Sequence, residues 1–245
     1  MAKRQFKAES KRLLDLMVNS IYTHKEIFLR EIISNASDAC DKLCYQALTD
    51  DAVGMSRKDF KIEIKVDKEH RTLTVSDNGI GMDKEDLENN LGVIASSGSY
   101  KFKQEVGDDA KDTDVIGQFG VGFYSAFMVA DHITVVTRKY GTDAAWMWQS
   151  SGADGYTITE CERDAVGTDI IMHIKPDTDD EKYSEFLESW RLQELVRKYS
   201  DYIRFPIRME VSKTRRKEGS PDDKPEYETY QDCLLYTSPS PRDRG

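Results

Sequence analysis

The chain has 245 residues, with 35 Lys and Arg against 45 Asp and Glu, which gives a formal net charge of -10. This acidic balance argues against a protein that holds nucleic acid or an anionic membrane through a positive surface field. No apolar run approaches the ~18 residues that cross a bilayer, and charges interrupt the apolar periodicity of the N-terminus where a signal peptide would be continuous. We therefore expect a cytoplasmic protein with no nucleic-acid and no membrane partner.

The first predicted elements are two helices and a β-hairpin. Apolar residues recur at helical spacing from Ser10 to about Leu48 with one short break, so we expect two helices, the second of them long. Strict alternation over residues 61–67 and 72–77, on either side of a KEHR turn, predicts a β-hairpin. Its second strand would deliver Asp77 at its end.

The region after the hairpin combines helices with charged and glycine-rich segments. KEDLENNLGVIASSG favours a helix with a Gly-Ser exit. Residues 99–115 are charged and lack apolar periodicity, so we expect a mobile segment. GQFGVGFYSAFMVAD, residues 117–131, predicts a glycine-rich loop that opens into an apolar helix near Phe123.

The second half of the chain predicts strands and then one long helix. The strand segments are HITVVTRKY, AAWMWQSS, YTITECE and GTDIIMHIKP, which read as parts of an antiparallel sheet. Residues 179–203 are amphipathic over a long helix, which Pro206 ends. Because helices and strands come in separate runs, we expect an α+β fold, a two-layer sandwich of helices on a mixed, mostly antiparallel sheet.

Four polar residues form one narrow stripe on the second helix. At 100° per residue, the stripe spans about 60° and consists of Glu31, Asn35, Asp38 and Lys42. A solvated helix face is the alternative explanation. However, apolar residues cover about half of the helix circumference, which is more than a solvated surface helix needs. The stripe also combines carboxylates with an amide, a mixture that suits contact with a ligand better than i,i+4 ion pairing.

Two glycine motifs are candidates for a ligand site, although neither is specific alone. DNGIGM, residues 77–82, by itself predicts a turn, because Asn-Gly tolerates positive φ. Gly117, Gly120 and Gly122 precede a helix, an arrangement that binds phosphate through backbone N–H groups and the helix dipole; a tight loop is the alternative. The chain has no P-loop, no G-x-G-x-x-G in a βαβ unit and no kinase motif. Any nucleotide site would therefore be of another kind.

The order and spacing of four motifs resemble the nucleotide-binding domain of heat-shock protein 90 chaperones. These motifs are IFLREIISNASDACDKL, DNGIGM, NNLGVIASSGS and IGQFGVGFYSAFMVAD, and the resemblance runs from about residue 6 to about residue 212. The family belongs to a wider ATPase superfamily with DNA gyrase, the mismatch-repair protein MutL and sensor histidine kinases. It implies a chaperone domain that binds and hydrolyses ATP and assists unfolded or stressed client proteins, with ATP or ADP and Mg²⁺ as cofactors.

The resemblance also implies roles for single residues. Asp77 would accept a hydrogen bond from the adenine amino group, Asn35 would bind the Mg²⁺ that bridges the phosphates, and Glu31 would orient and deprotonate the attacking water. Residues 83–116 would form a lid over the nucleotide. Further nucleotide contacts are implied for Asp38, Gly81, Met82, Asn90, Ser97, Gly98, Gln118, Phe119, Gly120, Val121, Gly122, Phe123 and Thr168.

The resemblance divides the chain into three parts. Residues 1–212 would be the nucleotide-binding domain and residues 213–232 a charged linker with the start of a truncated middle domain. Residues 233–245 do not continue the family pattern and look like read-through of a sequencing adapter; a genuine disordered tail is the alternative.

The family's middle domain supplies an arginine to the γ-phosphate and its C-terminal domain forms the homodimer, so we expect nucleotide binding here with slow hydrolysis at best. Ser96 stands where the family often has lysine, so we do not expect the cationic lid contact that this lysine would make.

Three other functions compete with this interpretation. The kinase part of a sensor would need an upstream phospho-acceptor helix, and only His24 is near a helix start. A non-enzymatic interaction module with a degenerate site is disfavoured by Glu31, Asn35 and Asp77. A DNA-acting relative is disfavoured by the acidic balance.

Overall fold

The structure is a computed structural model that describes residues 24–92, 122–152, 155–216 and 227–236. The first predicted helix and the segment 99–115 lie outside these ranges. The described elements, in chain order, are α2 (Ile27–Gln46), η2 (Asp51–Val53), η3 (Arg57–Asp59), β1 (Ile62–Asp67), β2 (Thr72–Asp77), α3 (Lys84–Leu91), η5 (Gly122–Met128), β3 (Ala130–Arg138), β4 (Ala145–Ser150), β5 (Tyr156–Cys161), β6 (Gly167–Ile174), η6 (Tyr183–Leu187), α5 (Ser189–Tyr199), β7 (Ile207–Arg216) and β8 (Tyr227–Tyr236).

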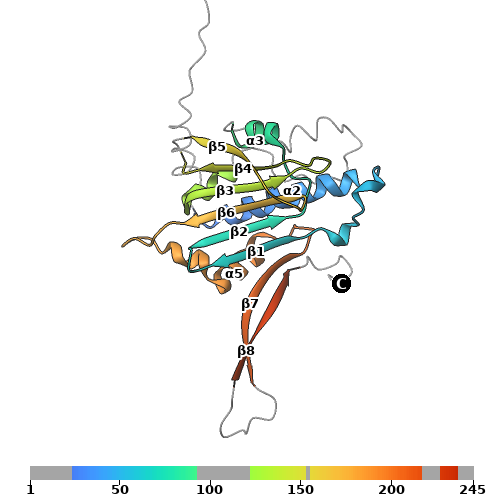
Figure 1. Cartoon of the computed structure of the whole chain (residues 1–245). Helices are drawn as coiled ribbons and strands as arrows, with labels where there is room; N and C mark the ends of the chain where they lie inside the picture. Colours follow the sequence, from blue (N-terminus) through green and yellow to red (C-terminus); the bar gives the residue numbers. More distant parts are fainter. Residues whose placement is uncertain (1–23, 93–121, 153–154, 217–226, 237–245) are drawn as a thin grey trace, which may run out of the picture.

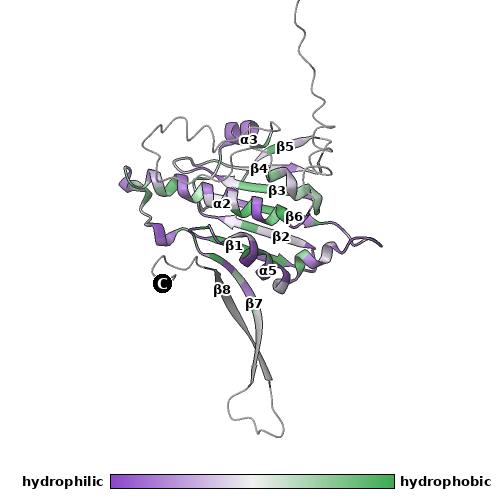
Figure 2. Cartoon of the chain, turned by 180° about the vertical axis from the view of Figure 1, so that it is seen from behind, coloured by the Kyte–Doolittle hydropathy of each residue, from purple (hydrophilic) through white to green (hydrophobic). Residues whose placement is uncertain are grey.

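One eight-stranded sheet forms the frame, in the order β5-β4-β3-β6-β2-β1-β7-β8. Neighbouring strands are antiparallel except β1 and β7, which are parallel. Helices α2 and α5 lie on one face of the sheet, as two opposite views show (Figures 1 and 2). The predicted sandwich of helices on a mixed, mostly antiparallel sheet is confirmed. None of the helices in the described ranges is long and apolar enough to cross a membrane.

The hairpin of β1 and β2 delivers Asp77 to the helix-covered side of the sheet. Leu73, Val75 and Asp77 alternate as the buried residues of β2. Since side chains alternate between faces with a period of two, Asp77 shares the face of these apolar neighbours. The sequence pattern that builds the core therefore also buries this carboxyl group.

Helix α2 is anchored at its start by Glu26. The Glu26 carboxylate accepts hydrogen bonds from Lys198, Tyr199 and Arg191 of α5. These donors, Lys198 first, lower the pKa of Glu26 from 4.5 to about 2. Two residues later, Phe28 packs edge-on against Phe186 of η6, with 5.2 Å between ring centroids. The N-terminal end of α2 is therefore fixed to the second helical segment of this face.

Two of the predicted helices differ from the structure. The apolar segment near Phe123 forms the 3₁₀ helix η5 instead of an α-helix. Residues 123–128 are all buried, so the segment has no polar face, and 3₁₀ geometry is common in short pieces of this kind. The helix predicted over residues 179–203 is two shorter helices, η6 and α5, because Glu188 between them is extended, with φ -95° and ψ 123°.

The C-terminal strands occupy part of the sequence expected to be linker and tail. β7 continues to Arg216, and β8 pairs with it from Tyr227 to Tyr236. This hairpin projects from the rest of the sheet (Figure 1). Residues 213–216 and 227–236, which fall within the expected linker over 213–232 and the expected tail from 233, are therefore strand. The domain boundaries, and the origin of residues 233–245, stay predictions.

Candidate functional site

Asp77 is a buried carboxyl group at the end of β2. It is 6% exposed, and its Oδ1 accepts the N–H of Gly79 at 2.9 Å. Burial raises the pKa of Asp77 from 3.8 to about 7, although the Gly79 N–H and the nearby Arg163 oppose the rise. Within the described ranges, no basic side chain forms an ion pair with it. Such an acceptor suits a neutral hydrogen-bond donor on a ligand.

The DNGIGM loop packs closely against other backbone segments. A Cβ at Gly79 would lie 2.3 Å from the carbonyl carbon of Ala39 in α2, and the N–H of Ile80 donates to the Ala39 carbonyl at 3.0 Å. Gly81 has φ +68°, and a Cβ there would lie 2.0 Å from the carbonyl oxygen of Arg138. Both glycines are therefore required by contacts within the protein, between α2 and the end of β3.

Two threonines lie beside Asp77 on the next two strands of the sheet, β6 and β3. Thr168 of β6 is opposite Asp77 in register, and Thr137 of β3 is opposite Thr168. Thr168 is 5% exposed and Thr137 has no exposed surface. The two hydroxyl oxygens are 3.0 Å apart, and the Thr137 oxygen accepts the N–H of Met82 at 2.9 Å. Asp77, Thr168 and the DNGIGM loop therefore form one connected polar cluster.

Sequence reasoning included Thr168 and Met82 but missed Thr137. The signal was present in HITVVTRKY, where alternation places Thr137 on the same face as the apolar Ile133 and Val135. A hydroxyl at a buried position of a strand must find partners, so this pattern indicates Thr137 as a further candidate site residue.

The polar stripe of α2 turns partly inward. Asp38 is 1% exposed, whereas Glu31 and Asn35 are half-buried. Burial lowers the pKa of Lys42, and the nearby Asp38 opposes that change. A fully solvated helix face does not fit these observations, so the alternative explanation of the stripe is wrong for its C-terminal half.

The carboxylate of Glu31 lies against Gly122, the last glycine of the glycine-rich segment. A Cβ at Gly122 would lie 2.4 Å from Oε2 of Glu31, so only glycine fits there without a shift. The other carboxylate oxygen of Glu31 accepts the Nε–H of Arg30 at 3.0 Å. Phe123 follows Gly122 into the core and packs edge-on against Trp148, with 5.4 Å between centroids. α2 and η5 therefore hold the Glu31 carboxylate between them.

The remaining implied contacts are only partly described. Asn90 is half-buried near the end of α3, which begins at the capping residue Asp83. No group of three or more His, Cys, Asp or Glu side chains that could hold a metal ion occurs in the described ranges. The other implied residues lie outside these ranges, and they are Ser97, Gly98, Gln118, Phe119, Gly120 and Val121.

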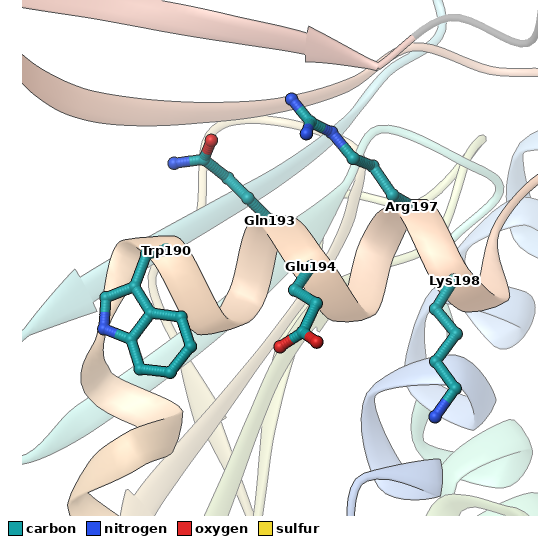
Figure 3. Close-up of a pocket in the computed structure, with 5 residues that line it drawn as sticks. All are labelled: Trp190, Gln193, Glu194, Arg197 and Lys198. Carbon is teal, nitrogen blue, oxygen red and sulfur yellow. The ribbon is translucent and has the colours of Figure 1, made fainter.

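A shallow hollow lies along α5, and none of the candidate site residues lines it. It is lined by Trp190, Gln193, Glu194, Arg197 and Lys198, and Trp190 is 62% exposed. Figure 3 shows these side chains leaving the helix in different directions. Because no polar groups converge there, this hollow lacks the arrangement typical of a small-molecule site.

Comparisons with known proteins cover most of the chain. A family model described as histidine kinase-, DNA gyrase B-, and HSP90-like ATPase matches residues 22–168, and a model described as Hsp90 protein matches residues 185–237. The chain is 58% identical over 228 residues to the chaperone protein HtpG of Clostridium perfringens, which covers 93% of this chain and 36% of that protein. It is 57% identical over 233 residues to the protein of the same name from Clostridium botulinum (95% and 36%) and 59% identical over 221 residues to that from Bacillus subtilis (90% and 35%). The chain therefore spans about a third of the length of these curated relatives.

Proposed function

Because the chain belongs to the histidine kinase-, DNA gyrase B- and HSP90-like ATPases, and among them to the heat-shock protein 90 family, we propose that it is the nucleotide-binding domain of an ATP-hydrolysing chaperone. The longer protein would assist unfolded or stressed client proteins as a homodimer in the cytoplasm. The observation that carries the proposal is the buried carboxyl group of Asp77 beside Thr168, which forms no ion pair with a basic side chain in the described part of the chain. The Hsp90 match over residues 185–237 favours a chaperone over the kinases and gyrases of the wider family.

Base recognition is assigned to the cluster around Asp77. A charged carboxylate that accepts from an exocyclic amine contributes about 1.5–3 kcal/mol, enough to select a base by its hydrogen-bonding groups. Oδ1 already accepts the Gly79 N–H, but a carboxylate has further lone pairs for a ligand. Thr168 supplies a second polar atom, while Gly81 and Met82 would shape the pocket. These residues fit adenine.

The phosphate end is assigned to the first half of the α2 stripe. Glu31 would orient and deprotonate the attacking water, and Asn35 would help to hold Mg²⁺, which neutralises phosphate charge when bound. Mg²⁺ needs few protein ligands when phosphates and waters complete its shell, so one amide is sufficient. Glu31 precedes Ala39, the contact of the DNGIGM loop, by eight residues, or about 12 Å of helix. This separation supports different roles for the two ends of α2.

The binding proposal is tested by calorimetric titration of the chain with ATP and ADP, with and without Mg²⁺. We expect saturable binding that Asp77→Asn abolishes and that Asp179→Asn, a matched change at an exposed position, preserves. A folded wild-type chain that binds neither nucleotide would favour the interaction-module alternative. The chain spans about a third of the length of its curated relatives, so the titration tests nucleotide binding rather than the activity of a longer protein.

A further inference from the structure

Thr137 joins two segments of the candidate site through one hydroxyl group. Its Oγ1 lies 2.9 Å from the backbone nitrogen of Met82, 3.1 Å from the carbonyl oxygen of Gly167 and 3.0 Å from Oγ1 of Thr168. Met82 belongs to the loop that follows β2, whereas Gly167 and Thr168 begin β6. These are the two segments that flank Asp77.

The three contacts have one assignment of protons that satisfies all of them. A hydroxyl has one proton and two lone pairs, the Met82 N–H can only donate, and the Gly167 carbonyl can only accept. Thr137 therefore accepts from Met82 and donates to Gly167, which uses its proton. The third contact then requires the Thr168 hydroxyl to donate to Thr137. In the reverse assignment, the contact with Gly167 would have no proton.

We infer that Thr137 is a positioning residue for base selection, because it fixes the Thr168 hydroxyl as a hydrogen-bond acceptor toward the ligand. The proton of Thr168 is directed to Thr137, so only the lone pairs of its oxygen remain for a bound base. Thr168 and Asp77 are opposite each other in register, and both then present acceptors. This pair favours a purine with an amino group over one with a carbonyl oxygen at the same ring position. The inference rests on the proposed nucleotide-binding function and adds how the base is selected.

A structural role for Thr137 alone predicts a different result. If the hydroxyl only held the Met82 loop against β6, its loss would weaken the binding of every purine nucleotide to a similar degree. If it orients Thr168, its loss frees the Thr168 proton to rotate and donate to a carbonyl oxygen. The ratio of the dissociation constants for ATP and inosine triphosphate therefore separates the two roles, since these ligands differ in the amino and carbonyl groups.

The experiment is a calorimetric titration of the whole chain with each nucleotide at pH 8.5, where the Asp77 carboxyl, with its pKa of about 7, is ionised. Thr137→Val removes the hydroxyl and keeps the shape, and Thr137→Ser keeps the hydroxyl. Thr134→Val is the matched control, because Thr134 lies on the other face of β3 and its hydroxyl accepts from Gln149 at 3.2 Å. We expect Thr137→Val to reduce the preference for ATP over inosine triphosphate about tenfold, as for one lost hydrogen bond. The serine and control variants should keep the wild-type preference.

Equal weakening of both nucleotides in Thr137→Val, or an unchanged preference, overturns the inference. If that variant does not fold, Thr168→Val is decisive, because it removes the oriented oxygen and leaves Thr137 bonded to Met82 and Gly167. It must reduce the same preference, and a wild-type preference in it overturns the inference. A folded wild-type chain that binds neither nucleotide overturns the proposed function and this inference with it, whereas adenine binding with no change in preference overturns the inference alone.

Discussion

The buried carboxyl group of Asp77 should make the ligand-free protein less stable as the pH rises. Burial raises the pKa of this group from 3.8 to about 7 in the folded state. The folded state therefore holds the proton more tightly than the unfolded chain, so the associated stability is present at low pH and is lost as the pH rises through about 7. At about 1.4 kcal/mol for each pKa unit, the ionised carboxyl lowers the free energy of unfolding by about 4 kcal/mol.

Part of this loss falls in a convenient pH range. Between pH 6 and pH 8, Asp77 changes from mostly protonated to mostly ionised in the folded state, while it is ionised throughout in the unfolded chain. Integration over this range gives a loss of about 1.4 kcal/mol in the unfolding free energy. Asp77→Asn removes the titration with little change in volume. The stability of the variant relative to wild type should therefore increase by this amount from pH 6 to pH 8.

Urea denaturation at pH 6, 7 and 8 measures the effect, with the fluorescence of the buried Trp148 as a reporter of unfolding. Asp179→Asn is the control, because it removes the same charge at an exposed position. Its stability should follow that of the wild type across the range. If Asp77→Asn also follows the wild type in parallel, Asp77 does not titrate there, and the argument from burial is wrong.

Three further substitutions test the fold and the site. The shift of the Glu26 pKa from 4.5 to about 2 corresponds to about 3 kcal/mol, which solvent screening reduces, so Glu26→Gln should lower the free energy of unfolding by about 2 kcal/mol at pH 7. Because the folded-state pKa of Glu26 is lowered to about 2, the deficit should shrink as the pH falls from 4.5 toward 2, and a deficit independent of pH would contradict the ion-pair explanation. Gly79→Ala should lower the free energy of unfolding, measured by urea denaturation, by about 3 kcal/mol, because the new methyl group would overlap the backbone of Ala39. Gly141→Ala is the control: its φ is positive, at +79°, but the position is open, so the loss should be about 1 kcal/mol. Equal losses would refute the packing argument. Glu31→Ala should still bind ATP in calorimetry but should no longer release phosphate, when it is tested in a chain extended to the length of the relatives. Loss of ATP binding would instead mean that Glu31 holds the ligand or the fold.

Most of the sheet and helix α2 could be predicted from the sequence, because their apolar periodicity is strong. The alternation of residues 72–77 predicted both the strand and the delivery of Asp77, which the structure confirms. The break at Glu188 could not be predicted from periodicity, since apolar spacing continues through it. It depends on local hydrogen bonds: the N–H of Glu188 donates to the Glu185 carbonyl at 3.0 Å and ends η6, and the Glu188 carbonyl accepts the N–H groups of Arg191 and Leu192 at 3.1 Å and begins α5. Such bonds begin a separate turn inside the expected helix.

The candidate site was predictable as separate motifs but not as an assembly. Helix geometry indicated that Glu31 and Asp38 share a face, and the strand pattern indicated the position of Asp77. No local pattern shows that the DNGIGM loop contacts Ala39, or that β6 lies beside β2 and brings Thr168 opposite Asp77. These contacts join residues far apart in the chain, so they depend on the tertiary fold. The roles of the site residues in binding nucleotide remain proposals.

Helix α2 connects the two ends of the candidate site as one rigid element. Near its middle, Ala39 is in backbone contact with the loop after Asp77, and two turns earlier Glu31 is in contact with Gly122. The loop therefore cannot shift against Asp77 without breaking the contact at Ala39 or moving the helix that carries Glu31. This rigidity keeps the Asp77 carboxyl buried although its ionised form is unfavourable near neutral pH, and strain of this kind is tolerated at functional sites when the surrounding packing maintains it. Stability and ligand binding thus depend on the same carboxyl group, and removing its charge should raise the first while abolishing the second.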